Sequence, residues 1–153
     1  MPASAQDFYL GNPNLKKVGT EIEFTQEQIQ EYLKCKADPV YFAMNYIKII
    51  SLDEGIVPFK MWDFQQELIR NFHENRFNIA KLPRQTGKST TCVSYLLHYA
   101  LFNDNVNIGI LANKLSTARD LLGRLQLAYE QLPLWMQQGL SLIHISEPTR
   151  RRH

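Results

Sequence analysis

The residues best suited to chemistry in this chain form one short loop at the start of a predicted helix. The run Leu82-Pro83-Arg84-Gln85-Thr86-Gly87-Lys88-Ser89 follows the phosphate-binding pattern G-x-x-x-x-G-K-[ST], except that Leu82 replaces the first glycine. Gly87 lets the backbone approach a phosphate without a Cβ clash. Lys88 can reach the β- and γ-phosphates of a nucleotide, and the Ser89 hydroxyl can ligate Mg²⁺. The alternative is an ordinary helix start that reads Gly-Lys-Ser.

The remaining loop residues extend this candidate site. Gln85 and Thr86 would contribute mainly backbone amides, beside the positive end of the helix dipole. Arg84 suits a cis arginine finger on the γ-phosphate; the alternatives are a solvated loop arginine or a contact with a neighbouring subunit. Pro83 and Thr90 complete the set that we expect to line an ATP-Mg²⁺ site.

A second candidate precedes the loop in the segment Trp62-Asp63-Phe64-Gln65. The Gln65 amide can both donate to and accept from the N7 and N6-amino edge of adenine, as glutamine does on DNA bases. Phe64 or Trp62 could stack on the ring. The simpler reading of Gln65 is an exposed helix residue beside core aromatics.

Other polar residues suggest no second centre. His73, His98 and Asp104 lack metal-ligand spacing. A hydrolytic carboxylate pair would be expected at the end of a hydrophobic strand, but the run Ile108–Ala112 is followed by Asn113. We therefore expect this chain alone to bind nucleotide weakly at best and to show no ATPase activity above background.

Helical segments are predicted in the first half of the chain. Thr25 and Gln28 form a capping-box pattern, and Asp38-Pro39 is typical of a helix start. These signals and the apolar spacing predict helices over 25–36, 38–52 and 62–75, with a turn at 53–55 and a short extended piece over 56–60.

The pattern changes to strand and helix from residue 77. Strands are predicted over 77–82 and 106–112, and helices over 88–101 and 116–132, the last with Ser116 as its cap. This order predicts a right-handed βαβ unit with parallel strands. The expected fold class is therefore α/β, a P-loop NTPase of RecA or helicase type with a parallel sheet, truncated after two strands and preceded by a helical lead-in.

Composition favours a globular protein without a large electrostatic DNA footprint. Apolar residues make up 44% and charged residues 21% of the 153-residue chain. The formal charge of +2 comes entirely from residues 140–153. No apolar run approaches the ~18 residues of a membrane span, and the N-terminus lacks the features of a secretion signal. The two cysteines, Cys35 and Cys92, fit a reducing cytoplasm.

The last residues are identified as foreign to the protein. Residues 140–150 match, in order, the translation of a transposase sequencing adaptor. A chance match of that length is negligible, so we expect 140–153 to be an artefact. The natural protein is then expected to continue past Gly139.

Several segments together resemble the large terminase subunit of myovirus-type tailed bacteriophages, the motor that pumps viral DNA into a procapsid. The resemblance covers residues 25–139 and is carried by Phe64-Gln65, residues 82–89 and 108–114, and the flanking runs 46–55 and 130–133. It implies Gln65 as adenine reader, Arg84 as sensor of the γ-phosphate, and Lys88 with Ser89 as phosphate and Mg²⁺ ligands.

The resemblance also implies an organisation and partners. Residues 25–76 would be a helical lead-in with the adenine-reading segment, and 77–139 the first part of the ATPase domain. Residues 1–24 lie before the resemblance; they show no sustained period and contain several turn residues, so a flexible arm, or one that docks elsewhere, is expected there. Expected partners are double-stranded DNA, the portal protein, the small terminase subunit and further copies in a ring, in the host cytoplasm and on the procapsid, with no membrane. The alternatives are a superfamily-2-type helicase or other P-loop DNA motor, and a catalytically incomplete nucleotide-binding fragment.

Overall fold

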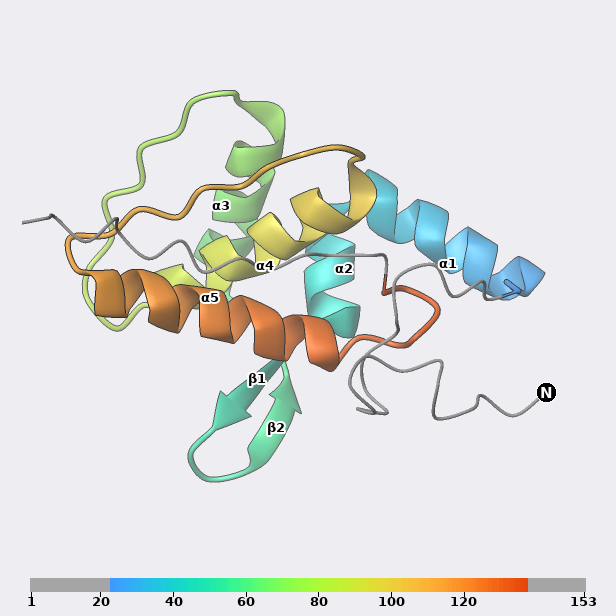
Figure 1. Ribbon diagram of the computed structural model, residues 1–153, viewed down its shortest axis with the longest axis horizontal. Helices are drawn as coiled ribbons and strands as arrows, with labels where there is room; N and C mark the ends of the chain where they lie inside the picture. Colours follow the sequence, from blue (N-terminus) through green and yellow to red (C-terminus); the bar gives the residue numbers. More distant parts are fainter. Residues whose placement is uncertain (1–22, 138–153) are drawn as a thin grey trace, which may run out of the picture.

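The computed structural model describes residues 23–137, and within them the chain is mainly helical (Figure 1). It contains five helices and two short strands in this range. Their order is α1 (Gln26–Ala37), α2 (Pro39–Tyr46), β1 (Lys48–Ser51), β2 (Gly55–Pro58), α3 (Asp63–Glu74), α4 (Lys88–Phe102) and α5 (Leu115–Glu130). Residues 1–22 of the arm predicted over 1–24, and the adaptor segment 140–153, lie outside the described residues.

Two helix starts confirm the predictions from capping residues. The Thr25 side chain accepts from the Gln28 amide, and the Gln28 side chain accepts from the Thr25 amide, so the capping box is complete. Asp38 accepts from the amides of Val40 and Tyr41 at the start of α2, with Pro39 in the first turn. Local side-chain chemistry therefore sets where both helices begin.

One core joins the helices of both halves of the chain. Phe42 of α2, Ile69 of α3 and Leu97 of α4 are each 0% exposed. Helix α4 lies at the centre and packs against α2, α3 and α5. The N-terminal end of α4, which carries the candidate loop, is thus held by a helix packed on several sides.

The predicted α/β fold is wrong for the described residues. Their only sheet is the antiparallel β1–β2 pair, with Ile49 opposite Val57, and no parallel strands form. The segments 77–82 and 106–112 run as unpaired chain between helices (Figure 1). Phe77 is 83% and Ile79 is 101% exposed. Parallel strands are stable when other strands and helices cover them, and a single two-strand unit cannot provide that cover.

The second predicted helix is also shorter than expected. It ends at Tyr46, and the β-branched pair Ile49-Ile50 lies in β1 instead. The chain then turns at residues 52–54, and Gly55 has a left-handed φ of +74° that allows the return into β2. The hairpin projects from the helices in Figure 1. A smaller correction applies to α5, whose N-cap is Lys114 and not Ser116.

Candidate functional site

The candidate loop is closed by hydrogen bonds between its own residues. The Lys88 ammonium donates to the Leu82 carbonyl at 3.3 Å, joining the first and seventh positions of the pattern. The Thr86 hydroxyl donates to the Pro83 carbonyl at 2.9 Å. Gln85 and Gly87 have φ angles of +61° and +68°. The loop is therefore a compact turn that leads directly into α4.

The structure brings Gln65 and the loop together, although 21 positions separate Gln65 from Thr86. The Gln65 side-chain NH₂ donates to the Thr86 carbonyl at 3.2 Å. Its side-chain oxygen accepts from the Trp62 amide at 3.0 Å at the start of α3. Gln65 is 6% exposed, so the alternative reading of Gln65 as an exposed helix residue is wrong, and its role as adenine reader stays a prediction.

Both the contact with Gln65 and the backbone conformation require a glycine at position 87. A Cβ at Gly87 would lie 2.6 Å from the Gln65 side-chain nitrogen, and its φ is one that other residues rarely adopt. Gln65 thus packs directly against the point where the loop becomes helix. This contact gives Gln65 a role in holding the loop.

The first turn of α4 presents amides without side-chain caps. Gly87 is the N-cap, and no side chain accepts from the first-turn amides. The buried Thr91 hydroxyl donates instead to the Gly87 carbonyl at 2.9 Å. The amides of Lys88, Ser89 and Thr90 have no partner within a helix by geometry. Together with the helix dipole they favour an anion at this end.

Two cations stand beside these amides without a carboxylate partner. Arg84 is exposed and Lys88 is half-buried. The ion pairs found within residues 23–137 join Lys34 to Glu31 and Arg124 to Asp120. The positive charge of the loop is therefore not neutralised by neighbouring acidic side chains in this part of the chain.

The aromatic residues near Gln65 differ in their exposure. Trp62 is 69% exposed and Phe64 is half-buried, with ring centroids 5.8 Å apart. Trp62 is thus the ring that remains open to a partner. Stacking of either ring on a base stays a prediction.

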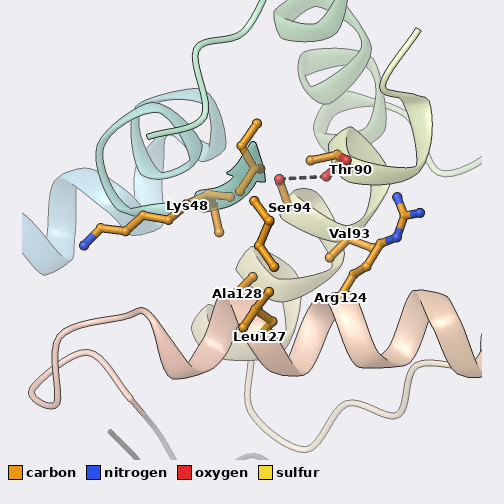
Figure 2. A pocket seen from close by; sticks show the side chains of 10 residues that line it. Lys48, Thr90, Val93, Ser94, Arg124, Leu127 and Ala128 are labelled. Atoms are coloured by element: carbon orange, nitrogen blue, oxygen red, sulfur yellow. Dashed lines mark hydrogen bonds between the residues drawn. The ribbon is translucent and has the colours of Figure 1, made fainter. Parts of the chain in front are cut away.

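A cavity of about 350 Å³ lies between β1, α4 and α5 and borders the candidate site at Thr90 (Figure 2). Its walls include Val93, Ser94 and Ala128, with Arg124 at the side. Sequence reasoning missed this cavity because three elements far apart in the chain form it. No spacing pattern in the sequence relates Ile47 to Ala128.

The far part of α4 holds a buried histidine. His98 is 2% exposed, and one ring nitrogen, Nε2, lies 2.8 Å from the Cys35 carbonyl at the end of α1. Its Nδ1 has no partner among the described residues. Burial lowers the pKa of His98 to about 4, so the ring is neutral near pH 7 and Nε2 carries the donated proton. His98 serves the packing of α4 and lies away from the loop.

One comparison with known protein families and two structural features of the described residues bear on the kind of site this is. No protein-family model matches this chain. Within residues 23–137 no cluster of three or more histidine, cysteine, aspartate or glutamate side chains could hold a metal. In the same range no helix is both long and apolar enough to span a membrane.

Proposed function

We propose that residues 82–90 bind the phosphates of Mg²⁺-bound ATP, and that the chain is the ATP-binding part of a viral DNA-packaging motor. The motor assignment follows from the resemblance to large terminase subunits. The binding assignment does not depend on a parallel sheet. It rests on one local observation, the closed loop that ends in an uncapped helix start.

The geometry suits a phosphate chain for three reasons. The uncapped amides of α4 are donors for phosphate oxygens. Among residues 23–137, Lys88 is bonded to a neutral carbonyl and forms no ion pair, so its ammonium can move to a phosphate without breaking an ion pair in this range. Arg84 extends the positive charge on the exposed side of the loop. A doubly or triply charged anion matches this arrangement better than a single carboxylate.

The metal fits as part of the nucleotide. Within the described residues no protein-only metal cluster exists, and Mg²⁺ commonly binds through phosphates with few protein ligands. Ser89, half-buried in the first turn, would supply the hydroxyl ligand. When bound, the ion would neutralise phosphate charge.

As a motor component, the protein would act with double-stranded DNA, the portal, the small terminase subunit and further copies of itself, in the host cytoplasm and on the procapsid. Arg84 would sense the γ-phosphate. Hydrolysis is expected to need carboxylates beyond the candidate loop. We therefore expect nucleotide binding by the 153-residue chain and phosphate release no faster than the background rate.

The test is a calorimetric titration with a non-hydrolysable ATP analogue and Mg²⁺. Lys88→Ala removes a charge-assisted contact and should weaken binding about 30-fold, equivalent to ~2 kcal/mol. Lys81→Ala is the matched control, because Lys81 is an exposed lysine just before the loop, and its affinity should stay within about twofold of wild type. Equal affinities for wild type and Lys88→Ala would contradict phosphate binding by the loop.

A further inference from the structure

The loop before α4 ends in two peptide units whose carbonyls are each held by a buried side chain. The Gln65 side chain donates to the Thr86 carbonyl at 3.2 Å, and the Thr91 hydroxyl donates to the Gly87 carbonyl at 2.9 Å. Gln65 is 6% exposed and Thr91 is 0% exposed. Both bonds therefore come from the interior of the protein and act where the loop becomes helix.

The direction of each carbonyl fixes the direction of the amide that follows it. A trans peptide unit is planar, so its C=O and N–H point in opposite directions. The Thr91 bond holds the Gly87 carbonyl along the helix, and the Lys88 amide of the same peptide unit therefore points out of the helix, toward the loop. The Gln65 bond acts in the same way on the Thr86 carbonyl and the Gly87 amide.

These two amides have the geometry of an anion site. Gly87 is exposed, has a φ of +68°, and is followed directly by the helical Lys88. A left-handed residue next to a right-handed one brings consecutive N–H groups onto one concave surface. The Gly87 carbonyl already accepts from the Thr91 amide at 3.0 Å. The hydroxyl bond is thus additional, and what it adds is a fixed orientation of this peptide unit.

We propose that Thr91 is a positioning residue of the phosphate site, which acts through the Gly87 carbonyl on the Lys88 amide. This inference rests on the proposed function, because it specifies how the same site is held ready for a phosphate. Thr91 is fully buried and does not itself contact the ligand. Without its hydroxyl, part of the binding free energy would be spent on orienting the peptide unit.

Ser94 provides a matched control one turn further along α4. Its hydroxyl donates to the Thr90 carbonyl at 2.8 Å, also four positions back, and the residue is 1% exposed (Figure 2). The amide of that peptide unit belongs to Thr91 and already bonds to the Gly87 carbonyl within the helix. It is not a donor for phosphate, so removal of the Ser94 hydroxyl leaves the phosphate donors unchanged.

The experiment measures the affinity for inorganic tripolyphosphate with Mg²⁺ by calorimetry, together with the Tm of each variant. Thr91→Val removes the hydroxyl at nearly constant shape and should weaken binding about fivefold. Its Tm should equal or exceed that of wild type, because the Gly87 carbonyl keeps the backbone donor of residue 91 and a buried hydroxyl is replaced by a methyl group. Thr91→Ser and Ser94→Ala should both bind within about twofold of wild type.

The outcomes separate the two proposals. Equal tripolyphosphate affinity in wild type and Thr91→Val would overturn the positioning role and leave phosphate binding by the loop intact. A wild type that does not bind tripolyphosphate would overturn the proposed function and this inference with it. Equal weakening in Thr91→Ser and Thr91→Val would assign the effect to packing and contradict a role of the hydroxyl. Thr91→Ala is a second variant without the hydroxyl, and its affinity should fall by at least as much as that of Thr91→Val.

Discussion

Helices α4 and α5 have similar N-terminal turns, but the segments that precede them differ. Neither has a side-chain cap on its first turn. Before α4 the chain forms the closed loop with Gly87 in a left-handed conformation. Before α5 it runs exposed, with Leu111 at 95% exposure and Lys114 in an extended conformation.

This difference shows which feature sets the candidate site at α4 apart from an ordinary helix start. Uncapped amides and a nearby lysine occur at both helix starts, so they do not distinguish a site. Only α4 is preceded by a turn whose carbonyls are held by Lys88, Thr86 and Gln65. The preceding loop, and not the helix start alone, is what favours phosphate binding at α4.

The largest expected effect is a loss of folding stability at acidic pH, caused by the buried His98 of α4. The pKa of His98 is lowered to about 4 in the folded state, so the unfolded state, with an ordinary value near 6.5, binds more protons between these values. The stability contribution is present above about pH 6.5 and is lost as the pH falls toward 4, by about 3 kcal/mol in the free energy of unfolding. Urea titrations across this pH range measure it.

A non-titrating variant isolates this contribution. His98→Gln retains an amide donor for the Cys35 carbonyl but cannot gain a proton. Its stability should therefore fall less than that of wild type between pH 6.5 and 4. Parallel pH profiles of the two proteins would show that His98 is not the group responsible.

The second prediction compares alanine substitutions of two glycines, one at the start of α4 and one within α5. Gly87→Ala forces a side chain into a left-handed backbone and against Gln65, and should cost about 1–2 kcal/mol of stability together with most of the phosphate affinity. Gly123→Ala in α5 meets nothing within 4 Å and should stabilise the protein by about 0.5–1 kcal/mol. Thermal melts and tripolyphosphate titrations measure both. A Gly87→Ala protein with wild-type stability and affinity would contradict the strained-loop account.

A feature could be predicted from the sequence when the residues that form it lie close together along the chain. The starts of α1 and α2 depend on residues within three positions, and Thr25 and Asp38 identified them. Strand formation over 77–82 and 106–112 depends on partners elsewhere, so alternation alone was misleading. The turn before α4 is likewise held by contacts within residues 82–88, and phosphate binding by it stays a prediction. The contact of Gln65 with Thr86 and the cavity beside Thr90 depend on tertiary packing, which no spacing pattern encodes.

The most direct measurement is the change in backbone amide resonances when tripolyphosphate and Mg²⁺ are added to the ¹⁵N-labelled chain. The two uncapped helix starts serve as internal comparison. We predict saturable shifts at the amides of residues 85–90 and none at 115–117. Shifts of equal size at both helix starts, or none at residues 85–90, would contradict phosphate binding by the loop before α4.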